Sequence, residues 1–328
     1  MVESNTDAES GGMPEGGERP AVRHVEVRRG DIGARLDQFL MRLLPGLPKS
    51  RVFRLVRRGE VRVNGKRATP EQRLAARDVV RVPPIWPESE GAAQVTGDAL
   101  GALAAAVLFE DERVLVLDKP ARTAVHGGIG VETGVIEALR VARPGEYVEL
   151  AHRLDRDTSG CLLVAKSAEA RSVLIELFRA ERVEKRYLAL VAGAWELGLK
   201  RVDAPLRTDL RVAGERTVKV QSGGKPALSE FRPERAFGRR ATLVEVALHT
   251  GRMHQIRVHA AYLGHPVAGD AKYGDARFNA ELRALGLRRT FLHARSVAFA
   301  WPEGGAVRVQ APLPAELAEV LERLGAQG

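Results

Sequence analysis

Apolar residues near the start of the chain recur at helical spacing and predict two helices. The first helix has one face built at i, i+3, i+4, i+7 and i+8 by Leu36, Phe39, Leu40, Leu43 and Leu44. Pro45 and Pro48 should end it, and Ser50 suits the N-cap of a second helix that Gly59 should close. The second helix divides into an apolar face with Val52, Phe53, Leu55 and Val56 and a basic face with Arg51, Arg54 and Arg58.

A short hairpin should follow these helices. Val61 and Val63 alternate with other residues, and the Asn64-Gly65 pair after them is a strong signal for a two-residue hairpin turn. We therefore expect residues 21–83 to form a small domain of two helices and a hairpin.

Residues 104–325 carry a different pattern, in which short apolar runs dominate. Helical spacing predicts one helix over 167–180, with Val173, Leu174, Leu177 and Phe178 facing inward. Strands are predicted at 107–110, 114–117, 186–191, 218–221, 229–235, 242–248, 291–299 and 307–309. Because strands do not alternate regularly with helices, we expect an α+β fold with a second, strand-rich domain.

Two stretches lie outside these domains. Residues 1–20 are mostly Gly, Glu, Ser and Pro and should be disordered, and the prolines and small residues of 84–103 are typical of a linker. No apolar run approaches the length of a membrane span.

The net charge of +9 is concentrated in the small domain. Between Lys49 and Arg81 the chain has eleven basic residues and three acidic ones, so this segment carries +8. The rest of the chain is nearly neutral. This distribution indicates a small module that grips a polyanion, attached to a body of ordinary charge.

The composition is that of a soluble globular protein. Of 328 residues, 45% are hydrophobic and 5% aromatic, which suffices for two domains with a large core. The single cysteine, Cys161, cannot form an internal disulfide, and the N-terminus lacks a signal-peptide pattern, so we expect the reducing cytoplasm. Cys161 lies in an apolar run and should be a small core residue.

Three features of the small domain resemble the S4 RNA-binding domain, which has an α-L fold. They are Arg-Leu-Asp from Arg35, the Lys49-Ser50 helix entry and Gly-Glu-Val-Arg-Val-Asn-Gly-Lys over 59–66. The resemblance implies RNA contacts from Arg51, Arg54, Arg58 and Lys66. The alternative is a solvated helix face, but solvated faces normally mix charge signs.

Residues 152–160, His-Arg-Leu-Asp-Arg-Asp-Thr-Ser-Gly, are the most informative run in the chain. They place Asp155 between Arg153 and Arg156, and a carboxylate held in this way stays ionised. The largely apolar runs 147–151 and 161–165 flank it, so the run should be a loop between two strands, where functional residues usually lie.

This run resembles the catalytic signature of the RluA/RluC-type pseudouridine synthases. Further stretches are similar to that family at 118–120, 124–128, 134–137, 185–191, 250–259, 264–270 and 292–294. The likeness is greatest to the RluC branch, which modifies 23S ribosomal RNA of the large subunit, and implies a mainly antiparallel sheet with a central cleft. Met253 and Arg122 depart from the pattern, where Thr or Ser and Gly respectively are common.

The resemblance implies an isomerisation of uridine that needs no cofactor. Asp155 is then the catalytic carboxylate, and Arg252 is the cation that keeps it ionised in an enclosed pocket, where burial alone would favour protonation. Tyr187 would stack on the target base and is a candidate for proton transfer. Arg153 would replace the flipped base in the RNA stack. Substrate contacts are also implied for His152 and Ile256.

Other site types are less well supported. A buried Asp-Arg pair is often only structural, and a tyrosine at the start of a strand usually packs in a core. The spacing of the histidines predicts no metal site: His152, His249, His254 and His259. Residues 128–130 lack the third glycine of a dinucleotide-binding loop, and Ser159 has no nucleophile elbow around it.

Two hypotheses remain. The first is a monomeric pseudouridine synthase whose S4 domain grips structured RNA. The second is a non-catalytic RNA-binding or ribosome-assembly protein that has kept the fold. Asp155, Tyr187 and Arg252 are all present, which favours the enzyme.

Overall fold

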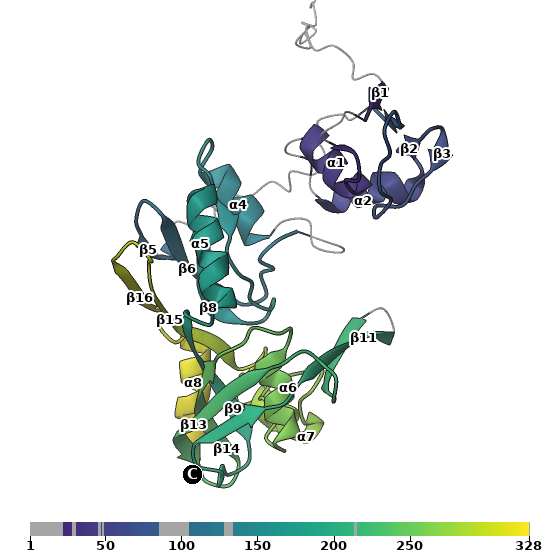
Figure 1. The fold of residues 1–328 in the computed structure, drawn as a ribbon. Coiled ribbons are helices and arrows are strands. Elements are labelled where there is room, and N and C mark those ends of the chain that lie inside the picture. The colour runs from purple at the N-terminus through teal and green to yellow at the C-terminus, as the bar shows by residue number, and fades with distance from the viewer. Residues whose placement is uncertain are drawn as a thin grey trace, which may run out of the picture. The chain divides into compact units, whose positions relative to one another are not determined.

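The computed structural model describes residues 22–27, 31–44, 47, 49–84, 105–127, 134–212 and 215–327. The chain divides into two units, Met1–Gly91 and Ala92–Gly328, which are considered separately (Figure 1). The predicted tail at 1–20 and the predicted linker, apart from residue 84, lie outside the described residues, as do Pro45 and Pro48.

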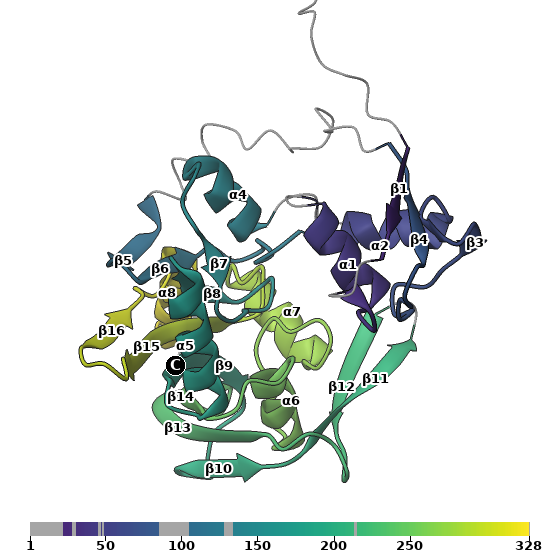
Figure 2. The same ribbon diagram turned by 45° about the horizontal axis from the view of Figure 1, so that its top comes forward.

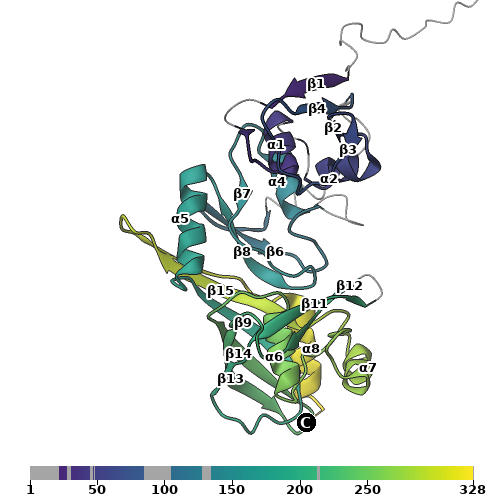
Figure 3. The same ribbon diagram turned by 45° about the vertical axis from the view of Figure 1, so that its right-hand side comes forward.

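The N-terminal unit joins two helices to a small antiparallel sheet (Figure 3). The helices are α1 (Leu36–Leu43) and α2 (Lys49–Arg58). The sheet has the order β1-β4-β2-β3, with β1 (Arg23–Glu26), β2 (Arg62–Val63), β3 (Lys66–Arg67) and β4 (Val79–Val82). The predicted apolar helix faces form its core together with the strands, through Leu36, Leu40, Val52, Val56 and Val80.

The turns of this unit follow the predicted chemistry, with one correction. Gly59 after α2 has φ +74°, and both Asn64 and Gly65 between β2 and β3 have positive φ, as a type I′ hairpin turn requires. Ser50 is not the N-cap of α2, because the chain is already helical at Lys49.

One ten-stranded sheet organises the C-terminal unit. Its main path runs β10-β13-β14-β9-β15-β8-β6-β5, with β16 paired to β15 and β7 to β8. The pair of β8 with β15 is parallel and the other described pairs are antiparallel, which confirms the expected α+β class and mainly antiparallel sheet. The strands in chain order are β5 (Val107–Glu110), β6 (Val114–Lys119), β7 (Glu149–Leu150), β8 (Ser159–Ala165), β9 (Glu184–Ala192), β10 (Lys200–Asp203), β13 (Leu228–Phe237), β14 (Ala241–Leu248), β15 (Leu292–Ala300) and β16 (Ala306–Gln310).

All eight predicted strands are present, with boundaries within three residues of the prediction. The predicted 218–221 strand belongs to a separate two-stranded ribbon, β11 (Leu206–Val212) with β12 (Glu215–Val220), seen clearly in Figure 2. The predicted helix is α5 (Ala168–Arg179), and Ser167 caps it by accepting a hydrogen bond from the Ala170 N–H at 3.0 Å. Four further helices are α4 (Val135–Ala142), α6 (Gln255–Tyr262), α7 (Ala276–Ala284) and α8 (Ala315–Gly325).

The centre of the sheet is buried on both faces. Successive residues of β8 alternate between two apolar clusters: Leu162 and Val164 pack with α4, whereas Cys161 and Leu163 pack with α5. Cys161 is 3% exposed, which confirms it as a core residue, and burial raises the pKa of its thiol to about 11. The loop that precedes β8 is therefore anchored to a strand that is buried on both faces.

Candidate active site

The run 152–160 is a loop between β7 and β8, as predicted, and its end is fixed by close packing. Gly160 has φ +107°, and a Cβ there would lie 2.2 Å from the carbonyl oxygen of Ala294 in β15. The parallel pairing of β8 with β15 begins at this point, with Ser159 opposite His293. Only glycine allows the two strands to approach in this way.

Two buried cationic side chains, those of Lys119 and Arg289, hydrogen-bond to the middle of the loop. The Lys119 ammonium, with no exposed surface, donates hydrogen bonds to the carbonyls of Pro120 at 2.8 Å, Thr123 at 2.8 Å and Arg156 at 3.1 Å. Burial lowers the pKa of Lys119 to about 8. The Arg289 guanidinium donates to the Asp157 carbonyl at 3.2 Å and to the Ser159 hydroxyl at 2.9 Å. These bonds fix the backbone on both sides of residue 155.

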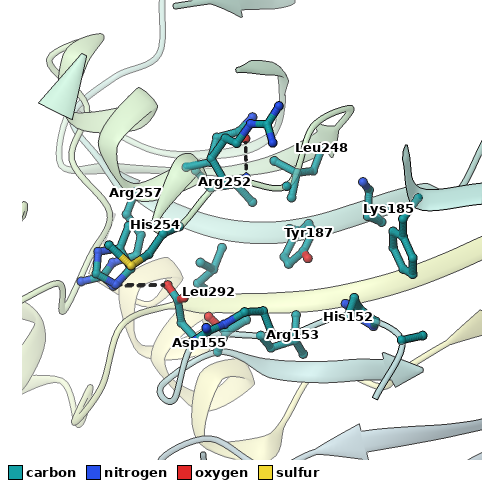
Figure 4. A pocket seen from close by; sticks show the side chains of 18 of the residues that line it. His152, Arg153, Asp155, Lys185, Tyr187, Leu248, Arg252, His254, Arg257 and Leu292 are labelled. Carbon is teal, nitrogen blue, oxygen red and sulfur yellow. Dashed lines mark hydrogen bonds and ion pairs between the residues drawn. The ribbon is translucent and has the colours of Figure 1, made fainter. Parts of the chain in front are cut away.

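A cavity of about 430 Å³ opens in front of the loop (Figure 4). It brings together all six site residues predicted in this unit: His152, Arg153, Asp155, Tyr187, Arg252 and Ile256. The loop supplies three of them, β9 supplies Tyr187, and α6 with the residues before it supplies the rest.

The ion pair to Asp155 comes from Arg257, so the predicted pairing with Arg252 is wrong. The Nη1 of Arg257 lies 3.3 Å from Oδ2 of Asp155 (Figure 4). Arg252 lines the same cavity, but its Nε donates to the carbonyl of Pro226 at 2.9 Å. The reason is local: His254, with φ +54°, turns the chain into α6, which places Arg257 inside the helix and leaves Arg252 before the turn.

A buried carboxylate orients Arg257. Its Nε and Nη2 form a fork to the two oxygens of Asp270 at 2.7 and 2.8 Å, and the Asp270 side chain has no exposed surface. Burial lowers the pKa of Arg257, but the hydrogen bonds and charge of Asp270 and the charge of Asp155 outweigh it, so the net shift is upward. Arg257 is therefore a permanent, fixed cation beside Asp155.

His254 is a further neighbour of Asp155. Its Nε2 lies 3.9 Å from Oδ2 of Asp155, and its Nδ1 lies 2.9 Å from the hydroxyl of Tyr273. That hydroxyl accepts a hydrogen bond from the Val218 N–H at 3.0 Å and can therefore donate to His254. Burial lowers the pKa of His254, which favours the neutral imidazole. The sequence does not single out this role, because it depends on the left-handed backbone at residue 254.

Tyr187 lies on β9 opposite Val246 of β14 and is 7% exposed. Burial, followed by the charge of Asp155, raises its pKa, so the side chain remains a neutral phenol at physiological pH. Figure 4 shows its ring beside the space in front of Asp155. Such a ring can stack on a base and exchange a hydrogen bond, but it does not serve as a phenolate.

His152 is held by the sheet. Its Nε2 accepts the backbone N–H of Leu163 at 2.9 Å, and its ring packs on Phe178 with centroids 4.9 Å apart. Burial lowers its pKa to about 3, so the ring is neutral. In this structure His152 supports the cavity wall, and its contact with substrate stays a prediction.

The predicted RNA-contacting residues of the N-terminal unit lie on α2 and β3. Arg54, Arg58 and Lys66 are exposed, and Arg51 is half-buried. Within the described ranges, His, Cys, Asp and Glu side chains form no cluster of three or more that could hold a metal ion. Every helix of the described part is too short or too polar to span a lipid bilayer.

Two family models match the chain, one in each unit. Residues 34–80 match the S4 domain, and residues 113–262 match RNA pseudouridylate synthase. The second range includes the loop with Asp155, β9 with Tyr187 and all of α6 with Arg257.

Curated proteins and a solved structure agree with these matches. Ribosomal large subunit pseudouridine synthase C of Yersinia pestis is 48% identical over 92% of this chain and 95% of its own length, and the protein of that name in Escherichia coli K12 is 46% identical over 94% and 98%. The structure of human RNA pseudouridylate synthase domain containing 4 is similar with a TM-score of 0.58 at 25% identity, over 69% of this chain and 95% of that one. The resemblance seen in the sequence is thus confirmed, and the chain belongs to the RNA pseudouridylate synthase family.

Proposed function

We propose that this protein isomerises specific uridines of 23S ribosomal RNA to pseudouridine. The observation that carries the proposal is the Asp155 carboxylate, which lies in a cavity beside Tyr187 and is paired with Arg257. The names of the curated relatives support large-subunit ribosomal RNA as the substrate. The family match and the S4 domain support RNA as the polymer.

The reaction breaks the bond between C1′ and N1 of the uridine, turns the base and joins C5 to C1′. N1 gains a proton and C5 loses one, so no redox partner or cofactor is required. A carboxylate can serve as a nucleophile toward C1′ or stabilise positive charge that develops there. Asp155 is placed for either role, because Arg257 and the loop fix its position without blocking the cavity.

The surrounding side chains receive complementary roles in this proposal. Tyr187 stacks on the target base and mediates proton transfer near C5, and Ile256, which is 4% exposed, packs against the base. Arg153, which is exposed at the mouth of the cavity, enters the gap that the flipped nucleotide leaves in the RNA. Arg252 contacts the RNA rather than the carboxylate.

The S4 domain supplies a grip on the RNA that does not depend on the chemistry. Its segment 49–81 carries +8, and neutralising phosphates with that charge gives strong, salt-sensitive binding. Arg51, Arg54, Arg58 and Lys66 are the proposed contacts. The protein would act as a monomer in the cytoplasm, where ribosomal RNA is made in bacteria.

Pseudouridine mapping on ribosomal RNA tests this function. RNA from a strain that lacks the gene should miss pseudouridine at particular positions of 23S RNA, and a plasmid copy of the wild-type gene should restore them. A plasmid copy with Asp155→Asn should not restore them. A full modification pattern in the deletion strain would contradict the proposal.

The same experiment separates the enzyme from a non-catalytic RNA-binding protein. If the Asp155→Asn protein restored growth or ribosome assembly and no modification depended on the gene, binding alone would be the function. The geometry favours the enzyme, because the Asp155 carboxylate, paired with Arg257, lines a cavity together with Tyr187 and Ile256.

A further inference from the structure

A second cavity, of about 570 Å³, adjoins the one that holds Asp155. The two share a rim that includes Arg153, Asp155 and Arg257, and Figure 4 shows the two arginines on either side of the carboxylate. We call the second cavity the arginine groove, after four side chains that line it and have no role in the chemistry above: Arg122, Arg156, Arg283 and Arg288.

Separate segments of the fold bring these four arginines together. Arg122 follows β6, Arg156 belongs to the catalytic loop, Arg283 lies in the last turn of α7, and Arg288 lies between α7 and β15. All four are exposed. These positive charges come from separate parts of the sequence and repel one another. Their convergence in one groove indicates an anionic partner.

Backbone carbonyls orient three of these guanidinium groups, those of Arg122, Arg156 and Arg288. Arg156 Nε donates to the carbonyl of Arg122 at 3.0 Å, and Arg122 Nη2 donates to the carbonyl of Arg288 at 2.7 Å. Arg288 Nη1 in turn donates to the carbonyl of Arg283 at 2.6 Å. Each bond uses part of a five-donor fork and leaves its charge intact, so the remaining donors are available to a ligand.

Carboxylates do not neutralise this group. Across the described residues, no ion pair involves any of the four, whereas other arginines of the unit are paired, as Arg295 is with Glu234 at 2.6 Å. The carboxylates that line the groove are Asp155, which Arg257 already pairs, and Asp157. The groove therefore keeps a large excess of positive charge.

Arg122, like Arg77, occupies a left-handed backbone conformation that non-glycine residues seldom adopt. Its φ is +65°, in the left-handed region that glycine enters without cost. Strain of this kind persists only where the surrounding structure holds the residue in place. Here the Arg122 side chain extends from the loop after β6 to the carbonyl of Arg288, and it lines the arginine groove.

We propose that the arginine groove binds the phosphates of the single RNA strand that continues from the target nucleotide, with Arg122 as a phosphate-binding residue. The inference rests on the proposed function, because a nucleotide flipped toward Asp155 stays joined to its neighbours, and the adjoining strand must pass over the shared rim. Guanidinium forks match the geometry of phosphate oxygens, and backbone-held forks lose little freedom when they bind.

The test compares Arg122→Gly with Arg239→Gly in the full-length protein. Both variants lose one positive charge, but Arg239 is an exposed turn residue between β13 and β14 and does not line the groove. The probe is an unmodified transcript of 23S ribosomal RNA, and the affinity is measured against salt concentration in the Asp155→Asn background, which prevents turnover. Arg283→Gln serves as a second groove variant, since the Arg283 side chain makes no hydrogen bond or ion pair with the residues that the structure describes; only its backbone carbonyl accepts one, from Arg288.

We expect Arg122→Gly and Arg283→Gln each to weaken binding about fivefold to tenfold and to reduce the slope of log affinity against log salt by about 0.7. Arg122→Gly should melt at the same temperature as the parent or higher, because glycine relieves the backbone strain. Arg239→Gly should match the parent in affinity and slope. Equal effects of the groove and control variants, or an unchanged slope for both groove variants, would overturn the proposal.

Activity distinguishes this inference from the proposed function. If wild-type protein forms pseudouridine in the transcript and the groove variants bind like the parent, the groove proposal fails and the enzyme stands. If wild-type protein forms none but the groove variants alone lose affinity, the groove stands as an RNA site and the proposed reaction fails.

Discussion

Asp155 owes its position to a relay of side chains that starts at Asp270. The Asp270 carboxylate accepts the fork of Arg257 and the N–H groups of Lys272 at 2.9 Å and Tyr273 at 3.1 Å. This set of bonds keeps the Asp270 charge buried and leaves Nη1 of Arg257 for Asp155. Removing one partner of such a buried pair costs about 3–5 kcal/mol.

The two arginines near Asp155 should differ sharply when each is changed to lysine. Arg257→Lys keeps the charge but loses the fork that joins Asp270 to Asp155, so we expect kcat to fall about 100-fold, the effect of misplacing a reacting group by about 1 Å. Arg252→Lys should keep kcat and raise KM, because its guanidinium holds a carbonyl and not the carboxylate. Single-turnover rates and melting temperatures of both variants provide the measurement. A larger loss of kcat in Arg252→Lys than in Arg257→Lys would instead support the pairing of Arg252 with Asp155 that the resemblance implies.

Tyr187 offers a separate test of how the proton is moved. Tyr187→Phe keeps the ring, so RNA affinity should stay near that of wild type, while kcat should fall about 100-fold or more if the hydroxyl mediates proton transfer. Tyr187→Leu should lose affinity as well. Because burial raises the pKa of Tyr187, wild-type activity should gain nothing from phenolate formation between pH 8 and about pH 10. A Tyr187→Phe rate within about twofold of wild type would limit Tyr187 to stacking.

The role of a single residue could be predicted where a sequence motif identifies that residue. It could not be predicted where the backbone conformation decides which of two nearby residues reaches the site. Asp155 lies in a nine-residue run that identifies it as the catalytic carboxylate by resemblance, and in the structure it lines the cavity. Arg252 and Arg257 lie in the same matched stretch, and the choice between them depends on the left-handed backbone at His254. No local pattern in the sequence predicts that conformation for histidine.

A helix or strand could be predicted from the sequence when its apolar side chains lie on one face and its polar side chains on the other. α5 has a capping serine and an apolar face, and its prediction is confirmed within one residue at each end. α6 buries Gln255 and His259 along with its apolar residues, so its sequence lacks the usual contrast between faces. α8 carries Leu317, Val320, Leu321 and Leu324 at helical spacing, so its signal is present in the sequence although the helix was not predicted.

One ion-pair network ties three elements together at the edge of the catalytic unit. Glu110 at the end of β5 pairs with Arg143 after α4 at 2.7 Å and with Lys166 after β8 at 2.6 Å. The hydrogen bond from Arg143, together with Lys166, lowers the pKa of Glu110 to about 2. The carboxylate therefore stabilises the folded state above its ordinary pKa of 4.5, and this contribution is lost as pH falls toward 2.

Glu110→Gln should measure that contribution. At pH 7 we expect the variant to be about 1–2 kcal/mol less stable than wild type, since the group is partly exposed, and the difference should shrink as pH falls from 4.5 to 2. Urea unfolding at several pH values provides the comparison. Glu176→Gln, which removes an exposed pair with Arg179, should have little effect at any pH. A Glu110→Gln difference that does not change with pH would argue against the network.

At the scale of the whole molecule, the division into two units was predictable and the order of the sheet was not. The charge excess and the change of apolar pattern mark the N-terminal unit, and its core forms a cluster of its own. The parallel pairing of β8 with β15 joins residues more than 130 positions apart, such as Ser159 and His293. Such pairings depend on the packing of the complete unit and leave no local pattern in either strand.

Deletion of residues 1–84 tests the division of labour between the units. The deletion removes the +8 segment and leaves every residue of the Asp155 cavity, so we expect weaker and less salt-sensitive RNA binding with residual activity on short RNA fragments. The measurement is the salt dependence of affinity for a 23S RNA transcript, together with turnover of a short fragment. If the slope of log affinity against log salt were unchanged, the S4 domain would not provide the electrostatic part of RNA binding.

The central claim is that the Asp155 carboxylate converts uridine to pseudouridine. The most direct measurement is tritium release from a 23S RNA transcript made with uridine labelled at C5, because joining C5 to C1′ expels the hydrogen from that carbon. Wild-type protein should release tritium in proportion to the uridines modified. Asp155→Asn, which keeps the volume and removes the charge, should release none above background while its RNA affinity stays within about threefold of wild type. Release by Asp155→Asn at a rate near that of wild type would contradict the account.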